Sequence, residues 1–467
     1  MKIKFLGAAR EVTGSKHLIT TERGRKILLD CGMFQGKGML TDSLNRNLGF
    51  DPKEIDNIIL THAHIDHSGL IPYMYKMGFR GSVICTQATL DLCSIMLADS
   101  GYIQELDVKW YNKKQARLRL PKIAPLYTVE DAEQCMKLFI GVAHDRRFYI
   151  DSNTNVKFSH TGHMLGSAVA NIEINENGEK KRIAYTGDIG RKQNKILHPP
   201  DTFAQCDYLI TESTYGNTLH STQDERDEDF QKIIIDTCVN KRGKLIIPAF
   251  SVGRTQEVVY VINKLYRENK IPRIDVFVDS PLAVDATQIF RMHTECMNKE
   301  CSDMLKTHAN PFGFSYINYI KDINESKVLN KRRTPCIIIS ASGMLEAGRV
   351  KHHVANSISN RRNTILMVGY CAPQTLGARI QEEGLKKISI FGEIHKIKAD
   401  IKKIDAFSGH GDYSEMINFL SCQDKKLLKN IFLVHGEYSV QVDYREKMSA
   451  AGFKRIKIPA VGEEFEL

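Results

Sequence analysis

The segment from Thr61 to His67, which reads THAHIDH, constrains this chain more strongly than any other. It contains three histidines and one aspartate, and it directly follows the apolar run from Asn57 to Leu60. Packed together without a cation, these polar groups would carry a heavy desolvation cost. Neutral imidazole and carboxylate groups are good ligands for zinc and similar divalent metals. The segment therefore predicts a metal site at the end of a β-strand.

The spacing within this segment favours more than one metal ion. In extended backbone, His62 and His64 point the same way because side chains alternate with a period of two. A loop after the strand can turn Asp66 and His67 toward a second ion. Further candidates stand beside glycines at the ends of other apolar runs, where residues share one rim of a sheet. These candidates are Asp30, His163, Asp188 and His435.

The pattern of apolar runs and helical stretches changes twice along the chain. The first 212 residues contain short strand-like runs, with helical patterns only at 89–99 and 129–140. From Ser213 onward, apolar runs alternate with helical stretches, which favours a parallel α/β sheet. After His395 the strand-rich pattern returns. The sequence thus predicts a domain of residues 213–395 inserted into a first domain made of 1–212 and 396–467.

Composition and charge exclude several classes of protein. With 467 residues, 42% of them hydrophobic and 26% charged, the chain is not a disordered or collagen-like one. It has neither an apolar run of the ~18 to 20 residues that span a bilayer nor a signal peptide, so we expect no membrane contact and a cytoplasmic location. Its 11 cysteines form no C-x-x-C pair and are interpreted as buried small residues. The net charge of +10 permits a polyanionic partner without requiring one.

The order H-x-H-x-D-H, followed by a lone His and an Asp, resembles the metallo-β-lactamase superfamily, whose fold is an αββα sandwich. Later motifs resemble the β-CASP nucleases, which include the endonuclease subunit of the eukaryotic cleavage and polyadenylation factor and its bacterial and archaeal relatives. The motifs are TESTYG at 211–216, PAFSVGR at 248–254, SGHGD at 408–412 and VHGE at 434–437. The similarity covers nearly the whole chain. It implies an α/β protein, in which the sandwich carries an inserted α/β β-CASP domain.

The resemblance also implies a role for each candidate residue at a site with two zinc ions. The implied ligands of the first zinc are His62, His64 and His163. The implied ligands of the second zinc are Asp66, His67 and His435. Asp188 bridges the two ions, and Asp30 orients a ligand without binding metal. Glu212 and His410 match two further motifs of the family, and no extra RNA-binding module flanks the core.

Two divalent metals can activate a shared water and stabilise the attacking and leaving oxygens of a phosphodiester. Asp66 and Asp188 offset only two of the four charges of two zinc ions, so the site would still attract an anion. His410, oriented by Glu212, is the candidate general acid for the leaving oxygen. A buried core histidine is the alternative interpretation of His410.

Three junctions in the inserted domain are typical of phosphate sites at helix amino termini, although ordinary helix starts have the same pattern. They are Ser251 to Arg254, Ser340 to Gly343 and Ala372 to Gly377. Arg254, Ser342 and Arg379 are the candidate RNA contacts. Separately, six basic residues between 109 and 122 accompany Trp110 and Tyr111, which predicts either a strand-guiding patch or a solvated amphipathic helix.

The leading hypothesis is a zinc-dependent ribonuclease that acts on single-stranded RNA by a two-metal mechanism and cuts within the strand. RNA is the expected partner, and a homodimer is allowed. A small-molecule hydrolase of thioesters or lactams is one alternative, although it would not need so large an inserted domain. A DNA nuclease is disfavoured because His435 matches the RNA branch of the family, and a non-catalytic binding subunit is disfavoured because every ligand position is filled.

Overall fold

The computed structural model describes residues 1–36, 38, 40–117, 121–220, 224–307, 310–369, 371, 374–404 and 409–467. These residues form two compact units. The first unit contains residues 1–194, 198–219 and 410–467, and the second contains 195–197 and 220–409. The domain boundaries expected from the sequence, at 212/213 and 395/396, stay a prediction. Ala372, Pro373 and Ser408, which belong to motifs singled out above, lie outside the described residues.

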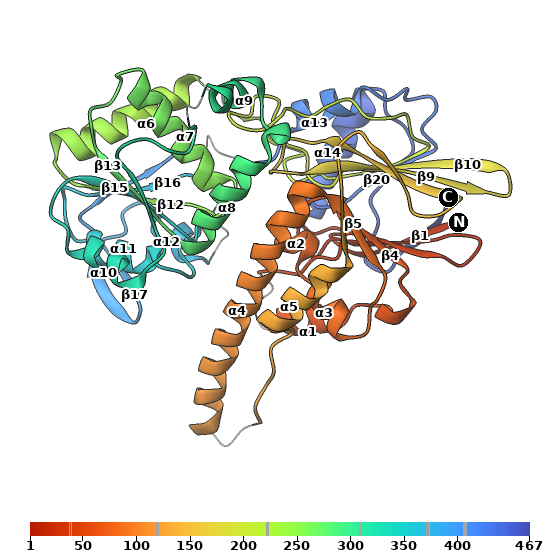
Figure 1. Cartoon of the computed structure of the whole chain (residues 1–467), viewed down its shortest axis with the longest axis horizontal. Coiled ribbons are helices and arrows are strands. Elements are labelled where there is room, and N and C mark those ends of the chain that lie inside the picture. The colour runs from red at the N-terminus through yellow and green to blue at the C-terminus, as the bar shows by residue number, and fades with distance from the viewer. Residues whose placement is uncertain are drawn as a thin grey trace. The chain divides into compact units, whose positions relative to one another are not determined.

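The strand-like runs of the first unit form two seven-stranded sheets. The first sheet has the order β22 (Glu464–Glu466), β1 (Lys2–Gly7), β2 (Lys16–Thr20), β3 (Lys26–Leu29), β4 (Asn57–Ile59), β5 (Ser82–Thr86) and β6 (Phe139–Val142). The second sheet has the order β21 (Ile456–Lys457), β20 (Asn430–Leu433), β11 (Tyr208–Thr211), β10 (Glu179–Tyr185), β9 (Ala168–Glu176), β8 (Thr154–His160) and β7 (Arg147–Tyr149). Both chain ends lie at this sandwich, since β1 pairs with β22 (Figure 1).

A hydrophobic core joins the two sheets face to face. Phe5 and Ile59 of the first sheet pack with Phe158, Tyr185 and Phe432 of the second. Helices cover the outer faces, with α13 and α14 packed on the second sheet and α4 against β5 and β6 (Figure 1). The helices of this unit are α1 (Leu40–Arg46), α2 (Ile65–Ser68), α3 (Ile71–Lys76), α4 (Gln87–Arg117), α5 (Val129–Cys135), α13 (Tyr413–Leu420) and α14 (Tyr438–Ala450). This arrangement confirms the αββα sandwich.

Two helical patterns of the sequence were bounded wrongly. The pattern at 89–99 is only the start of α4, which continues to Arg117 because its second half packs on the returning chain. Gly101 lies so close to this chain that a Cβ atom would stand 2.9 Å from the carbonyl carbon of Thr128. The pattern at 129–140 ends in a strand instead, because Phe139 to Val142 pairs with β5 as β6.

The second unit is built on a six-stranded, fully parallel sheet, as the alternating runs predict. Its order is β14 (Ile317–Ile320), β13 (Asp275–Asp279), β15 (Cys336–Ser340), β12 (Lys244–Pro248), β16 (Thr364–Met367) and β19 (Asp400–Lys403). A hairpin of β17 (Lys387–Ile390) and β18 (Glu393–Lys396) adjoins it in sequence. The unit extends to Gly409 because β19 pairs with β16.

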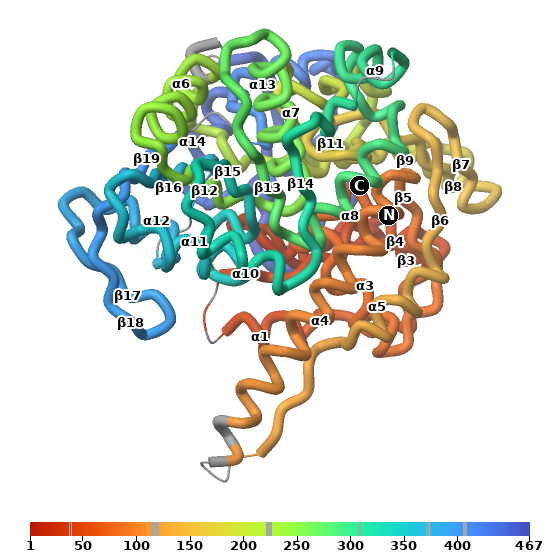
Figure 2. The backbone as a smooth tube through the Cα atoms, turned by 60° about the vertical axis from the view of Figure 1, so that its left-hand side comes forward, coloured from red at the N-terminus to blue at the C-terminus, as the bar shows by residue number. Residues whose placement is uncertain are grey.

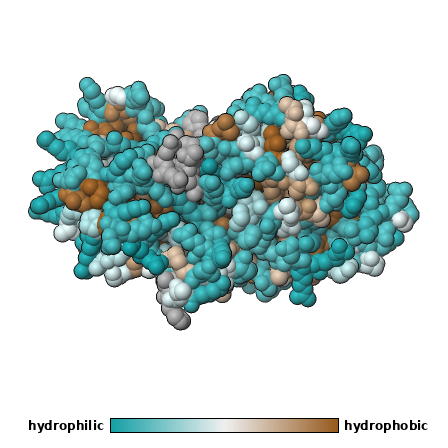
Figure 3. Space-filling view, turned by 90° about the horizontal axis from the view of Figure 1, so that it is seen from above, coloured by the Kyte–Doolittle hydropathy of each residue, from teal (hydrophilic) through white to brown (hydrophobic). Residues whose placement is uncertain are grey.

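Along the chain, α6 precedes the first strand of the second unit and the other helices lie between its strands, as Figure 2 lets the reader follow. These helices are α6 (Asp224–Ile234), α7 (Arg254–Arg267), α8 (Pro281–Met292), α9 (Lys299–Lys306), α10 (Ile323–Lys331), α11 (Val350–Ser357) and α12 (Leu376–Arg379). The face of the molecule in Figure 3 is mostly hydrophilic, with small separate hydrophobic patches. Among the described helices, none combines the length and apolar character needed to cross a membrane.

Candidate metal centre

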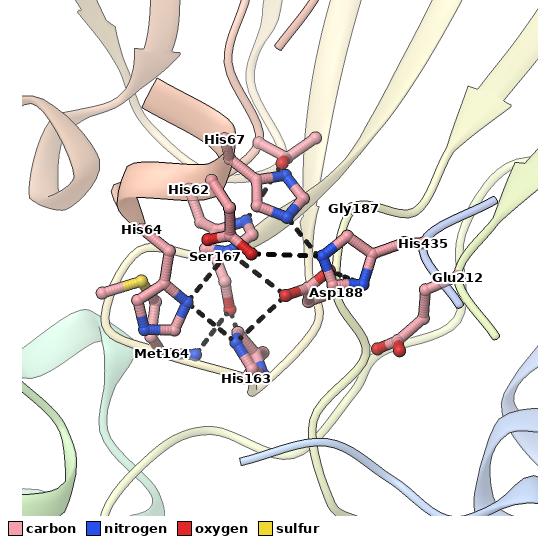
Figure 4. A network of polar contacts seen from close by, with 12 residues as sticks. His62, His64, His67, His163, Met164, Ser167, Gly187, Asp188, Glu212 and His435 are labelled. Atoms are coloured by element: carbon pink, nitrogen blue, oxygen red, sulfur yellow. Dashed lines mark hydrogen bonds and ion pairs between the residues drawn. The ribbon is translucent and has the colours of Figure 1, made fainter. Parts of the chain in front are cut away.

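The predicted ligands stand on loops that follow strand ends of the first unit. His62 and His64 follow β4, and Asp66 and His67 lie in the short helix α2. His163, Asp188 and His435 follow β8, β10 and β20 respectively. The structure brings all seven of these residues together. Figure 4 labels all of them except Asp66.

One group consists of His62, His64, His163 and Asp188, whose ligand atoms all lie within 4.8 Å of one another. Nδ1 of His64 is 3.1 Å from Nε2 of His62 and 3.1 Å from Nε2 of His163. Oδ2 of Asp188 lies 3.4 Å from Nε2 of both His62 and His163. Three ring nitrogens and one carboxylate oxygen therefore face a common point.

The second group consists of Asp66, His67 and His435. Nε2 of His435 is 3.4 Å from Oδ2 of Asp66. Oδ1 of Asp188 lies 3.3 Å from Nε2 of His67 and 3.6 Å from Nδ1 of His435. Each oxygen of Asp188 thus faces a different group, which is the geometry that a bridging carboxylate requires.

Asp30 holds His67 in place from behind. Its Oδ2 atom accepts hydrogen bonds from Nδ1 of His67 at 2.6 Å and from the hydroxyls of Thr61 and Tyr185, both at 2.8 Å. Its other oxygen accepts from the backbone N–H of Thr61 at 2.8 Å. Because Nδ1 of His67 is engaged, Nε2 is the ring nitrogen that points to Asp188.

Sequence reasoning missed several residues that support the ligands. The Oγ atom of Ser167 accepts from the backbone N–H groups of His163 and Met164, at 3.0 and 3.1 Å, and so shapes the turn that carries His163. The Oγ1 atom of Thr214 lies 2.9 Å from Nδ1 of His435. Thr61 and Thr214 belong to the motifs THAHIDH and TESTYG, and Ser167 and Tyr185 lie near strand ends, but no signal in the sequence gave any of the four a contact with a ligand.

Burial and mutual charge set the protonation state of the cluster. Burial lowers the pKa of His62 and His163, and it lowers that of His64 to about 3, so these three rings are neutral at neutral pH. Burial alone would raise the pKa of Asp66 and Asp188, but the surrounding histidines hold both well below the usual range. His67 differs: although burial lowers it, the pKa of this ring is raised well above its usual value by Asp188 and Asp30, so His67 would have to release a proton to bind a metal through Nε2.

The donor set fits two divalent cations. Among the described residues, the buried atoms Nε2 of His67 and Oδ1 of Asp188 face each other at 3.3 Å, and neither makes a hydrogen bond. Buried polar atoms are rarely left in that state unless another group completes them. Nδ1 of His64 lies 3.1 Å from Nε2 of both His62 and His163, so the three nitrogens are close enough together to bind one cation in place of the hydrogen bonds between the rings.

His410 and Glu212 form a pair at the edge of this cluster. Nδ1 of His410 lies 3.0 and 3.1 Å from the two carboxylate oxygens of Glu212. Glu212 is buried and also accepts from the backbone N–H groups of Ile189 and Thr214. Although burial lowers it, the pKa of His410 is raised to about 9 by Glu212 and Asp188. Nε2 of His410, 3.9 Å from Oδ2 of Asp188, is directed at the cluster.

The candidate phosphate contacts lie in the second unit, where β12, β15 and β16 end at one edge of the parallel sheet. The loops that follow these strands touch, since the N–H of Gly377 donates to the carbonyl of Met344 at 2.9 Å. Arg379 is exposed. Arg254 donates to Glu257 at 2.6 Å with its side chain only 12% exposed, and Oγ of Ser342 accepts from the backbone of Glu346.

Comparisons with known proteins agree with this geometry. Three family profiles match: the metallo-beta-lactamase superfamily at residues 12–76, the Beta-Casp domain at 255–380, and the Zn-dependent metallo-hydrolase RNA specificity domain at 394–459. Ribonuclease TTHA0252 of Thermus thermophilus is 33% identical over 453 residues, which cover 97% of this chain and 95% of that protein. An RNase J-like protein of Methanocaldococcus jannaschii is 32% identical over 98% of this chain and 96% of its own length.

A third relative is longer than this chain. The transcription termination factor FttA of Methanosarcina mazei is 29% identical over 98% of this chain and 70% of its own length. The two ribonuclease-named relatives match along almost their entire lengths, and the same strand-end loops that supply the metal cluster lie within the matched regions. The chain therefore belongs to the β-CASP ribonuclease family of the metallo-β-lactamase superfamily, and it is a metal-dependent hydrolase.

Proposed function

We propose that the chain is a zinc-dependent ribonuclease that hydrolyses phosphodiester bonds within single-stranded RNA. The observation that carries the proposal is the convergence of seven ligand residues with the pair of His410 and Glu212. Relatives of nearly the same length that are named ribonucleases support the choice of RNA over thioesters, lactams or DNA. The RNA specificity domain that matches residues 394–459 supports the same choice.

Two zinc ions would be held by the two groups of ligands, with Asp188 between them. The first ion would take His62, His64 and His163, and the second would take Asp66, His67 and His435. When bound, such ions lower the pKa of a water molecule and stabilise negative charge on a phosphodiester. The carboxylates of Asp66 and Asp188 offset only part of their charge, which favours an anionic substrate. Asp30 keeps His67 in the tautomer that leaves Nε2 available.

His410 would donate a proton to the leaving oxygen. Glu212 accepts a hydrogen bond from Nδ1 of His410, so the protonated ring presents its second N–H, on Nε2, to the cluster. Glu212 and Asp188 raise the pKa of this ring, which favours its protonated form. A positioned acid of this kind typically accelerates a reaction by ~10² to 10⁴.

The strand ends of β12, β15 and β16 would bind the RNA backbone. Arg379 offers an exposed guanidinium at this edge. To reach a phosphate, Arg254 would have to break its ion pair with Glu257. Ser342 would have to give up the hydrogen bond that it accepts from the backbone N–H of Glu346. We therefore rank Arg379 first among the three.

The proposal is tested by digestion of RNA and DNA, single- and double-stranded, labelled at the 5′ or the 3′ end, with and without a chelator. Internal fragments from single-stranded RNA under both labels, lost with the chelator and restored by zinc, are expected. Asp188→Asn is the inactive control. Release of mononucleotides from the 5′ end would show that the enzyme is an exonuclease and does not cut within the strand. Hydrolysis of a thioester or lactam without RNA cleavage would overturn the proposal.

A further inference from the structure

A basic surface cavity of the first unit has no role in the reaction proposed above. It has a volume of about 620 Å³ and lies where the chain enters β20 and β21. Two loops border it, residues 423–428 between α13 and β20 and residues 452–455 between α14 and β21. The charged residues that line it are Asp424, Lys425, Lys426, Lys454 and Arg455.

The positive charges of this cavity are not neutralised by acids. In the part of the chain that the structure describes, no carboxylate forms an ion pair with any of the four basic residues. Asp424 already accepts from the backbone N–H of Lys426 at 2.9 Å, and the nearby Asp207 is paired with Arg182 at 3.2 Å. The last four residues of α13 and of α14 contain no acid. The cavity therefore attracts anions.

Only two of the four cations have a structural role. Lys425 donates to a backbone carbonyl at the end of α14 at 2.7 Å, and Arg455 donates to a carbonyl of the other loop at 3.3 Å. Lys426 and Lys454 are exposed, and their side chains have no partner among the residues that the structure describes. The stability of the two loops therefore does not account for this second pair.

The cavity and the metal cluster lie at opposite edges of the second sheet. Lys429 directly precedes β20 at the edge with the cavity, and His435 of the metal cluster follows the same strand. Six residues of extended chain span about 20 Å. A single strand that reaches both places therefore needs more than about six nucleotides, at ~3.4 Å between successive phosphates.

We propose that this cavity binds the phosphate backbone of the RNA outside the segment that is cut, so that the first unit holds the strand at two places. This inference rests on the proposed function. Repeating phosphates suit the cavity better than one small anion, because Lys425 and Arg455 are tied to backbone carbonyls and are not free to gather around one point. The exposed Lys429 and Lys457, beside the lining, continue the positive surface.

Fluorescence anisotropy with labelled RNA of about 5 and about 20 nucleotides tests the site, in an Asp188→Asn background that leaves the RNA intact. Lys426→Glu combined with Lys454→Glu should raise the Kd of the longer RNA about tenfold at ~0.15 M salt, because two phosphate contacts are lost. The slope of log Kd against log salt concentration should fall by about 1.4. The Kd of the shorter RNA should not change, because this RNA cannot reach the cavity from the metal cluster.

The control combines Lys53→Glu with Lys137→Glu, which changes the net charge equally at exposed lysines elsewhere in the unit. It should keep both affinities. An equal loss for both RNA lengths, or an equal loss in the control, would overturn the second site. If the wild-type chain cuts RNA and the cavity variant keeps its affinity for both lengths, the second site fails and the proposed function stands. If the wild-type chain neither binds nor cuts RNA, the proposed function itself fails.

Lysine acetylation followed by mass spectrometry locates the contact in the Asp188→Asn chain. The longer RNA should protect Lys426 and Lys454 and leave Lys53 and Lys137 reactive, whereas the shorter RNA should protect none of the four. Equal protection by inorganic phosphate would show a site for a small anion. Protection without RNA at high protein concentration would show a contact with a second copy of the chain. Either result would overturn the proposal.

Discussion

At the scale of single residues, the proposed roles in metal binding and in proton transfer fall to different side chains. Seven side chains converge as candidate metal ligands, and Asp30 hydrogen-bonds to one of them. His410 approaches the same cluster but is tied to Glu212, whose carboxylate is held by two backbone N–H groups. The two functions can therefore be removed independently by substitution.

His410→Ala should slow RNA cleavage by ~10² to 10⁴ and leave the zinc content unchanged, because a general acid is lost and no ligand. A nitrophenyl phosphodiester has a good leaving group and needs little protonation, so the variant should recover much of its rate on that substrate. Steady-state kinetics and elemental analysis measure both effects.

The matched control is His163→Ala, which should lose zinc and should not recover on the nitrophenyl substrate. If His410→Ala also loses a zinc ion, then His410 supports the metal directly and the acid must be another group.

At the scale of elements, loops of different strands meet so closely that only glycine fits between them. A Cβ atom on Gly32, just after β3, would stand 1.6 Å from the backbone carbonyl oxygen of Asp66. The same loop donates from the backbone N–H of Cys31 to the carbonyl of His67 at 2.7 Å. The conformation of the ligand segment thus depends on a neighbouring strand end.

Gly32→Ala should displace Asp66 and His67 and so lower the zinc occupancy of the second group. The zinc ion at His62, His64 and His163 should stay bound. Elemental analysis of the folded variant should show about one zinc per chain in place of about two. Gly369→Ala is the control, because no atom of the described residues lies within 4 Å of a Cβ built there. Full zinc content in Gly32→Ala would show that the segment adapts and that the glycine is not required.

A second element-scale feature is the network that joins β13, α10 and α11 in the second unit. The buried carboxylate of Asp279 accepts from Nε2 of His353 at 2.6 Å, from Nη1 of Arg349 at 2.7 Å and from the hydroxyl of Ser326 at 2.5 Å. Burial alone would raise the pKa of Asp279, but His353, Ser326 and Arg349 lower it.

The pKa of Asp279 in the folded protein lies below its unfolded value of about 3.9. Ionised Asp279 therefore stabilises the unit at pH values above 3.9. This stabilisation is lost as the pH falls through the pKa of the folded state. Asp279→Asn should lower the free energy of unfolding by about 3 kcal/mol near neutral pH, and by progressively less in acid. Urea titrations across this pH range measure the difference.

Asp275→Asn, at a half-exposed ion pair with Arg332, should cost less than about 1 kcal/mol and serves as the control. A loss in Asp279→Asn that does not depend on pH would mean that the charge of Asp279 contributes nothing.

At the scale of the whole molecule, the net charge of +10 favours association with a polyanion. The net charge does not show where a polyanion binds, because binding requires cations that are free to reach phosphates. Arg379 is exposed, whereas Arg254 is paired with Glu257.

RNA affinity should fall as the salt concentration rises. In a plot of log Kd against log salt concentration, each phosphate contact to a single strand contributes about 0.7 to the slope. Arg379→Ala should reduce this slope by about 0.7, and Arg254→Ala should reduce it less. Fluorescence anisotropy with labelled single-stranded RNA measures both. A larger loss of slope in Arg254→Ala would mean that Arg254 exchanges Glu257 for a phosphate and would reverse our ranking.

Much of the fold and the candidate site could be predicted because chemistry restricts the residue types involved. Few side chains besides histidine and carboxylates bind divalent metals well, so THAHIDH, His163 and Asp188 stand out in the sequence alone. The alternation of apolar runs and helices likewise indicated the parallel sheet of the second unit, because each strand and helix must bury its own apolar face.

Tertiary structure decided the rest, since those features depend on contacts between distant residues. Tyr185 donates to Asp30 across 155 positions, and neither residue carries a local signal for that pairing. Residues 139–142 pair as a strand with β5, and the part of α4 beyond residue 99 contacts the returning chain at Gly101 and Asn112. The sequence by itself thus determined which groups can bind metal, and only the folded chain determined what orients them.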